Sequence, residues 1–344
     1  MITVSLCMIV KNEERVLKRC LDSVADLVDE LIIVDTGSTD KTMQIAASYP
    51  GVKLYEFTWV GDFSKARNFA FSKATKEYIY SADADEVLNE ENRERFRLMK
   101  EALLPEVEIV QMKYGNQLQY GTVYNYDEEY RPKLFKRIRE FSWMDPIHET
   151  INTQPVIYDS EIVITHMPES AHAGRDFAAF ERLTGGGELL SKRLRNMYAK
   201  ELFIAGETKD FLNARTFFET AAKDTGLKSD EVKEACLVAA AAARRAGDES
   251  AFFKLAMKVM ADGGCAELCR ELGDLYFDKQ DYEEAAIWYY NACYETEPLL
   301  ALCVQGAQTV EKLAQCYEKM GLPAQAAWYR EELVKLQENH PIIL

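Results

Sequence analysis

Two aspartates that follow a short apolar run are the residues most able to do chemistry. Asp83 and Asp85 come directly after the β-forming run 78–80 (Tyr-Ile-Tyr), which predicts a buried strand. Alternate side chains of an extended chain point to the same side, so we expect the two carboxylates to lie together. Carboxylate oxygens suit a hard divalent cation such as Mg²⁺ or Mn²⁺, which keeps waters and also takes phosphate oxygens. An acidic turn without function is the alternative that so short a motif leaves open.

The elements around these aspartates predict a parallel α/β sheet. Residues 2–10 and 31–34 are apolar runs typical of strands, residues 53–57 are predicted to form a third strand, and segments of helical periodicity separate the three. Strand-helix-strand-helix-strand order implies right-handed crossovers and ligand binding at the carboxyl ends of the strands. Those ends carry Asn12 and Glu13 after the first strand and Asp35 after the second. Asn12 is expected to cap the following helix, and Ser38 or Thr39 the next one.

Several classes of protein are disfavoured by composition and by missing motifs. Neither a P-loop nor a Gly-x-Gly-x-x-Gly turn follows the first strands, which argues against a P-loop NTPase or an ordinary dinucleotide-binding domain. The net charge of −16 argues against a general nucleic-acid binder. No apolar run approaches the length of a membrane span. The eight cysteines are scattered among hydrophobic positions, which predicts free thiols in a cytoplasmic protein.

The second half of the chain has the periodicity of a helical repeat. Beyond the break at Gly185 to Gly187, alanines, leucines and tyrosines recur at helical spacing. Residues 269–298 fit the tetratricopeptide pattern, and the anchor alanines Ala214, Ala251, Ala285 and Ala326 lie 34 to 41 residues apart. Such helix pairs stack into a solenoid with a concave surface. That surface predicts a groove for a peptide or protein acceptor, with dimerisation or a purely structural role as alternatives.

Four blocks in the first half resemble the family 2 glycosyltransferases of the GT-A fold. They span residues 10–14, 34–40, 62–68 and 83–86, in the family's order and spacing. The branch that the chain most resembles has a C-terminal tetratricopeptide region and includes the S-glycosyltransferase of the peptide sublancin. Lipopolysaccharide-core glucosyltransferases share much of the N-terminal pattern. The resemblance covers residues 1–170 by sequence and the rest by architecture.

The resemblance implies a GT-A domain with a mainly parallel sheet over 1–185 and an all-α, tetratricopeptide-like domain over 186–344. It implies inverting transfer of a sugar from a UDP-sugar, such as UDP-glucose or UDP-N-acetylglucosamine, to a peptide or protein side chain with a divalent metal. A cell-surface saccharide is the alternative acceptor, and an inactive binding scaffold is the alternative from another class. A sugar nucleotidyltransferase is disfavoured because residues 6–12 lack its glycine-rich loop. A homodimer is left open.

The resemblance also assigns donor and metal positions. The donor-binding positions are Val10, Glu13, Asp35, Ser38, Arg67, Asp83 and Ala84. Asp35 would accept a hydrogen bond from the base edge, and Arg67 would reach a phosphate or the nucleoside. Asp85 would be the main metal ligand, with Asp83 and His166 completing the set. His166 is followed by Met-Pro, where the family commonly has Tyr-Gly.

The acceptor side is assigned to the block 144–149, which resembles the family's Ile-His-Glu block. An inverting displacement needs a base beside the acceptor, and the candidates are Glu149 first and Asp145 second. The alternative is that His148 and Glu149 only brace the site. The basic segment 130–137 could face the diphosphate or could be solvated.

Overall fold

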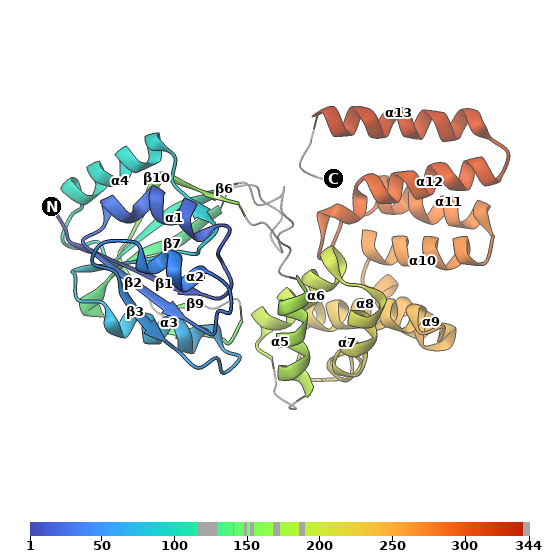
Figure 1. Cartoon of the computed structure of the whole chain (residues 1–344). Helices are drawn as coiled ribbons and strands as arrows, with labels where there is room; N and C mark the ends of the chain where they lie inside the picture. Colours follow the sequence, from blue (N-terminus) through green and yellow to red (C-terminus); the bar gives the residue numbers. More distant parts are fainter. Residues whose placement is uncertain are drawn as a thin grey trace. The chain divides into compact units, whose positions relative to one another are not determined.

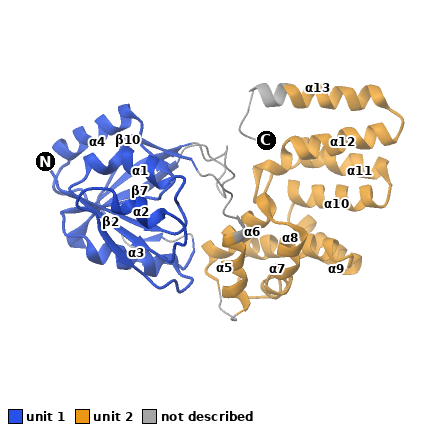
Figure 2. Cartoon of the chain, in the orientation of Figure 1, with its two compact units in different colours: residues 1–120, 126–171 blue, residues 121–125, 172–344 orange. Residues whose placement is uncertain are grey.

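The chain forms two compact units, which are described separately. The computed structural model describes residues 1–115, 129–139, 141–147, 150–151, 155–167, 173–185 and 190–339. One unit comprises residues 1–120 and 126–171, and the other comprises residues 121–125 and 172–344 (Figure 2). In the described part of the chain, no helix is long and apolar enough to cross a membrane.

The first unit is built on one mixed, mainly parallel sheet (Figure 1). Its strand order is β3-β2-β1-β4-β7-β6-β10-β5 among the described residues. These strands are β1 (Val4–Val10), β2 (Glu30–Asp35), β3 (Lys53–Glu56), β4 (Tyr78–Ser81), β5 (Glu86–Val87), β6 (Ile109–Gly115), β7 (Glu129–Lys136) and β10 (Ile157–His166). β1 to β4 pair in parallel and so do β6 and β10, whereas β7 and β5 run antiparallel to their neighbours. A separate ribbon pairs β8 (Trp143–Met144) with β9 (Thr150–Ile151).

Helices cover both faces of this sheet, because alternate residues of its buried strands point to opposite sides. The helices are α1 (Leu17–Val24), the short η1 (Ala25–Leu27), α2 (Thr42–Ala47), α3 (Phe63–Lys73) and α4 (Glu90–Ala102), and η3 (Arg137–Arg139) follows β7. Leu6 packs in one core with residues of α1 and α4, whereas its neighbour Cys7 packs in a second core with α3. The predicted strand-helix alternation is therefore confirmed.

Two predicted helix caps are wrong. α1 begins at Leu17 and has no side-chain cap, while Asn12 has a left-handed backbone (φ 57°) and its Oδ1 accepts from Thr39 N–H at 2.8 Å. Neither Ser38 nor Thr39 caps α2, because the helix begins at Thr42 and Lys41 occupies its N-cap position. Asp40 is the side chain that accepts from the first turn of α2, through Thr42 N–H at 2.9 Å.

The second unit is all helical in its described residues. Its α-helices are α5 (Ala173–Gly185), α6 (Lys192–Ala205), α7 (Thr208–Ala221), α8 (Ser229–Arg245), α9 (Glu249–Ala261), α10 (Ala266–Asp278), α11 (Tyr282–Tyr290), α12 (Ala307–Lys319) and α13 (Pro323–Asn339). The π-helical turn η4 (Asn291–Glu295) and the 3₁₀ turn η5 (Leu302–Gln305) lie between α11 and α12. This unit includes α5, which the sequence placed at the end of the first domain.

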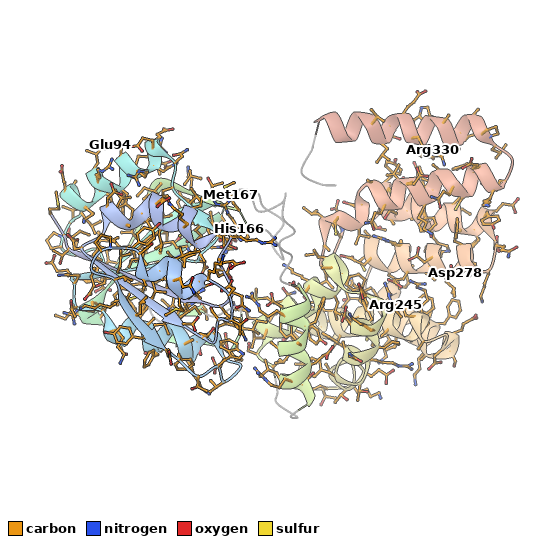
Figure 3. The ribbon with its side chains drawn as sticks, viewed as in Figure 1. Glu94, His166, Met167, Arg245, Asp278 and Arg330 are labelled. Carbon is orange, nitrogen blue, oxygen red and sulfur yellow. The ribbon has the colours of Figure 1, made fainter. Side chains whose placement is uncertain are left out.

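Small residues and a buried ionic cluster join the helices of this unit. The anchor alanines Ala214, Ala285 and Ala326 are buried, as close helix packing requires. Arg245 of α8, labelled in Figure 3, bonds to the buried Glu271 of α10 at 2.8 Å. The fold class that the GT-A resemblance implies, a mainly parallel α/β sheet followed by an all-α region, is confirmed.

Candidate functional site

Hydrogen bonds tie together the loops that follow β1 and β2. These bonds run from Thr36 N–H to Val10 O (2.9 Å), from Asn12 N–H to Ser38 Oγ (2.9 Å) and from Glu13 N–H to Thr42 Oγ1 (2.7 Å). Val10 also lies opposite Asp35 in the parallel register of the two strands. Four predicted donor-binding residues, Val10, Glu13, Asp35 and Ser38, therefore meet at one edge of the sheet.

The Asp35 carboxylate folds its own loop. It accepts from Gly37 N–H at 3.2 Å and from Ser38 N–H at 3.0 Å, and Asp35 is 7% exposed. The left-handed φ of 109° at Gly37 lets the chain turn back over the carboxylate. A carboxylate has about four acceptor positions, so these bonds leave capacity for a ligand donor. Contact with a nucleoside base stays a prediction.

Asp83 pairs with Arg67, which α3 presents from the neighbouring helix layer. Arg67 Nη2 lies 2.9 Å from Asp83 Oδ1, and the guanidinium carbon lies 5.3 Å from the centre of the Trp143 ring. Burial alone would raise the pKa of Asp83, but the charges of Arg67 and Lys133 outweigh it and lower that pKa to about 2. Asp83 is therefore ionised at neutral pH and holds the arginine in place.

Asp85 faces His166, which comes from the end of another strand. His166 Nε2 lies 3.2 Å from Asp85 Oδ2, with side chains 21% and 15% exposed. The residues from 83 to 86 form a turn, in which Glu86 N–H donates to Asp83 O at 3.2 Å, and not the extended strand that would aim both carboxylates alike. The structure thus brings together two of the three predicted metal ligands and directs Asp83 to Arg67.

The end of β10 is held in place by its backbone. His166 lies opposite Glu86 in the antiparallel pairing of β10 with β5, and Met167 N–H donates to Asp85 O at 2.9 Å. Arg19 of α1 donates to Met167 O at 2.7 Å. Figure 3 labels His166 and Met167 at this end of the strand. The orientation of His166 toward Asp85 therefore follows from strand pairing.

A buried ion pair lies directly behind the two aspartates. Lys133 of β7 bonds to Glu86, and both residues are buried, so Lys133 is not solvated. Burial raises the pKa of Glu86, and Lys133 opposes that rise. Lys133 also lies 5.1 Å from the centre of the Tyr114 ring, which in turn contacts His166 at 5.2 Å. The sequence showed the basic segment 130–137 but not the pairing of Lys133 with Glu86, because Glu86 is 47 residues away along the chain.

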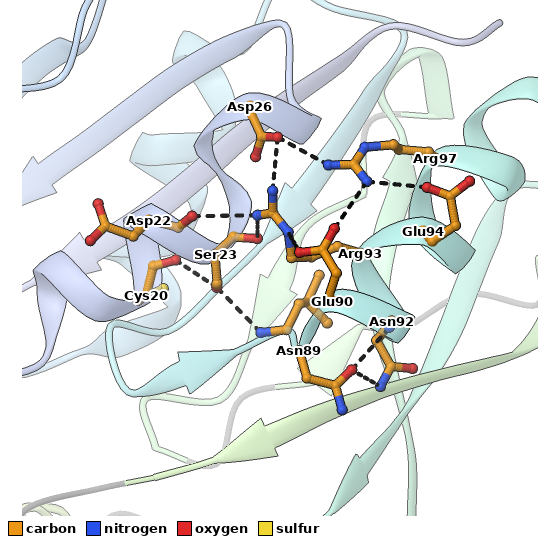
Figure 4. A network of polar contacts seen from close by, with 11 residues as sticks. Cys20, Asp22, Ser23, Asp26, Asn89, Glu90, Asn92, Arg93, Glu94 and Arg97 are labelled. Atoms are coloured by element: carbon orange, nitrogen blue, oxygen red, sulfur yellow. Dashed lines mark hydrogen bonds and ion pairs between the residues drawn. The ribbon is translucent and has the colours of Figure 1, made fainter.

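A polar network between α1, η1 and α4 fixes the segment that follows Asp85 (Figure 4). Ser23 Oγ accepts from Leu88 N–H at 3.2 Å and donates to Cys20 O at 2.7 Å. Arg93 donates to Ser23 O at 2.5 Å and pairs with Asp26 at 2.9 Å. Both ends of the turn that carries the aspartates are therefore anchored in helices.

Of the residues predicted on the acceptor side, the structure describes Asp145. Asp145 has a left-handed φ of 69°, and the following Pro146 O accepts from Phe63 N–H at 3.0 Å. His148 and Glu149 lie outside the described residues. The choice of Glu149 or Asp145 as the base stays a prediction.

Asp85 and His166 supply the donor atoms that a metal ion could use at this site. Within the described ranges, no group of three His, Cys, Asp or Glu side chains is placed to hold a metal ion. Asp85 and His166 offer one carboxylate and one imidazole side by side. Hard divalent cations commonly take one or two protein ligands and fill the other positions with water and substrate phosphate oxygens. The pair is therefore compatible with such an ion, provided that the substrate supplies the remaining ligands.

Comparison with known proteins connects this arrangement to a family. Residues 5–159 match the model of glycosyl transferase family 2. A TPR repeat-containing protein of Synechococcus elongatus is 38% identical over 154 residues, which cover 44% of this chain and 36% of the relative. The SPbeta prophage-derived glycosyltransferase SunS of Bacillus subtilis is 41% identical over 92 residues, covering 26% of this chain and 22% of the relative. The matches thus span about a third or less of these curated relatives.

Among solved structures, S. aureus TarS 1–349 in complex with UDP is 14% identical with a TM-score of 0.38, covering 76% of this chain and 92% of that chain. The sequence predicted a family 2 domain followed by a helical region, and both are present. The chain carries a glycosyltransferase domain, and residues 5–159 belong to glycosyltransferase family 2.

Proposed function

We propose that the chain is an inverting glycosyltransferase that moves a sugar from a UDP-sugar to a side chain of a peptide or protein, with a divalent metal. The observation that carries this proposal is a set of two side-chain pairs: Asp83 pairs with Arg67, and Asp85 lies beside His166. Both pairs lie at the carboxyl end of the sheet, where an α/β fold binds ligands. The family 2 match supports the reaction class.

The donor is proposed to lie along the ends of three adjacent strands. β2, β1 and β4 are neighbours in the sheet, so their carboxyl ends form one continuous edge. On that edge lie Val10, Glu13, Asp35 and Ser38, then Asp83 and the buried Ala84. Asp35 would accept from the uracil edge, and Arg67 would bind a phosphate or the nucleoside while Asp83 keeps it oriented.

Asp85 and His166 would hold Mg²⁺ or Mn²⁺ through a carboxylate oxygen and an imidazole nitrogen. Such an ion supplies Lewis-acid stabilisation of the charge that grows on the departing diphosphate. The rest of the local chemistry belongs to the protein. Glu86 and Lys133 fix the strand behind Asp85, and the pairing of β5 with β10 keeps His166 opposite it.

The acceptor is proposed to attack the anomeric carbon from the face opposite the nucleotide. Glu149, or else Asp145, would remove its proton, an effect worth about 10² to 10⁴-fold in rate. The helical unit is proposed to bind the peptide or protein that carries the acceptor, because stacked helix pairs form extended concave surfaces.

Release of UDP from UDP-glucose and UDP-N-acetylglucosamine in the presence of Mn²⁺ tests this function. The Asp85→Ala variant is expected to lose at least about a hundredfold in turnover, since it removes electrostatic stabilisation of the leaving group. Asp159→Ala is the matched control, because Asp159 is an exposed aspartate of β10 away from the site. Wild-type turnover by Asp85→Ala would contradict the assignment of Asp85. No UDP release by the wild type from any UDP-sugar would favour a binding scaffold.

A further inference from the structure

One residue of α3 binds a separate backbone segment by both ends of its carboxamide. Asn68 Nδ2 donates to Trp143 O at 3.0 Å, and Asn68 Oδ1 accepts from Trp143 N–H at 2.8 Å. The side chain thus pairs with Trp143 in the way that a neighbouring strand would, through one donor and one acceptor. Only one orientation of the amide satisfies both bonds, so both groups of the carboxamide are needed.

The indole of Trp143 is held against the same helix by packing. Its ring lies 5.8 Å from that of Phe71, on α3, and 5.6 Å from that of Phe135, on β7. The buried indole Nε1 has no hydrogen-bond partner among the residues that the structure describes, so ring contacts fix the side chain and Asn68 holds the backbone. Pairing of β8 with β9 and the bond from Phe63 N–H to Pro146 O also hold the segment 143–147.

Consecutive residues of α3 therefore reach two different parts of the site. Arg67 pairs with Asp83, on the donor side, and its guanidinium also lies over the Trp143 ring. Asn68 holds the backbone of Trp143, two residues before the candidate base Asp145. Neighbouring helix positions point about 100° apart, which lets one rigid helix set the distance between the two parts.

We propose that Asn68 is a positioning residue, which fixes the segment 143–147 and its Asp145 beside the Arg67–Asp83 pair. The inference rests on the proposed function, because it assigns this segment to the acceptor side. Asparagine is the suitable residue here, since an aspartate of the same shape could accept from Trp143 N–H but would set a carboxylate against Trp143 O. Loss of this pairing loosens the acceptor side and leaves the donor side intact.

The test compares Asn68→Asp with Ser72→Asp, which adds the same charge one turn later on α3. Ser72 is exposed, and its hydroxyl donates to Phe69 O at 2.7 Å within the same helix. Hydrogen exchange of the peptide that contains Trp143 is expected to be roughly tenfold faster in Asn68→Asp, because repulsion between the new carboxylate and Trp143 O pushes the two apart and weakens the bond from Trp143 N–H. Exchange is expected to be unchanged in Ser72→Asp. UDP release with UDP-glucose and Mn²⁺ is expected to show kcat about tenfold lower with KM within about twofold of wild type.

Two results would overturn the proposal. One is unchanged exchange of the Trp143 peptide in Asn68→Asp, which would show that Asn68 does not fix the segment. The other is a rise in KM for UDP-glucose as large as that of Arg67→Ala, which would place Asn68 in donor binding. Failure of the wild type to turn over UDP-sugars would refute the proposed function and with it the catalytic role of Asn68. The exchange measurement would then show separately whether Asn68 holds the segment.

Discussion

Two aspartates that stand two residues apart have separate partners in this fold. Asp83 binds Arg67, 16 residues earlier, and Asp85 faces His166, 81 residues later. The sequence predicted that both lie at a strand end, because the apolar run before them is local information. The apolar run gave no sign that Asp83 pairs with Arg67, because tertiary contacts set the turn at 83–86. The family resemblance, in contrast, had placed Asp85 and His166 in one metal-ligand set.

Charge compensation at Asp83 keeps it ionised, whereas Glu201 in the helical unit has the opposite environment. Glu201 of α6 is 8% exposed, and burial together with the charge of Asp176 raises its pKa to about 7. A carboxyl with a raised pKa in the folded state favours folding only while it is protonated. Stability is therefore lost as the pH rises from the unfolded value near 4.5 through about 7.

Glu201→Gln is expected to stabilise the protein at pH 8, by up to the order of 3 kcal/mol, because the amide stays neutral in the folded state. The gain in the free energy of unfolding should shrink to less than about 1 kcal/mol at pH 5, where wild-type Glu201 is protonated when folded. Urea unfolding followed by far-UV circular dichroism at the two pH values measures this difference. A gain that does not change with pH would show that the ionisation of Glu201 is not its cause.

At the scale of elements, strands and helices were predictable where the signal is local periodicity. The strands β1, β2 and β4 and the helices α1 and α2 follow from apolar spacing. The caps of α1 and α2 were not predictable, because Asn12 and Ser38 join the two loops to each other. The ion pair of Lys133 with Glu86 was not predicted for a similar reason, because a lysine in a basic segment gives no sign of a buried partner on another strand.

Helices α10 and α11 approach each other closely at Gly273. A Cβ at Gly273 would lie 2.6 Å from the Tyr289 ring, and that ring is fully buried and fixed by a 2.7 Å bond from its hydroxyl to Asp274. Gly273→Ala is therefore expected to destabilise the helical unit by about 1–3 kcal/mol, because overpacking forces a shift.

The matched control is Gly185→Ala, at the end of α5, where an added Cβ meets no atom of the described residues within 4 Å. This variant should be neutral or slightly stabilising, by at most about 1 kcal/mol, since alanine favours a helix over glycine. Thermal unfolding by circular dichroism compares the two. Equal stability of both variants would mean that Tyr289 can move aside, against the packing described.

At the scale of the whole molecule, the order of an α/β unit and a helical unit was predictable from the change in periodicity along the chain. Each unit has its own buried clusters, with Leu6 and Cys7 in cores of the first and Leu313 in a core of the second. The boundary was less predictable, because the contacts of α5 with α6 and α7, which no local pattern shows, are what assign it to the helical unit. The family 2 match accounts for residues 5–159, so the acceptor role of the helical unit rests on its repeat architecture alone.

Binding of a UDP-sugar, measured by calorimetry with and without Mn²⁺, tests the central claim most directly. The claim is that Asp85, beside His166, completes a metal-dependent donor site on a strand edge shared with Asp35 and the Arg67–Asp83 pair. We expect the wild type and Asp159→Asn to bind UDP-glucose or UDP-N-acetylglucosamine at least about tenfold more tightly with Mn²⁺. Asp85→Asn is expected to lose this dependence. Equal binding by all three proteins, with or without the metal, would contradict the account.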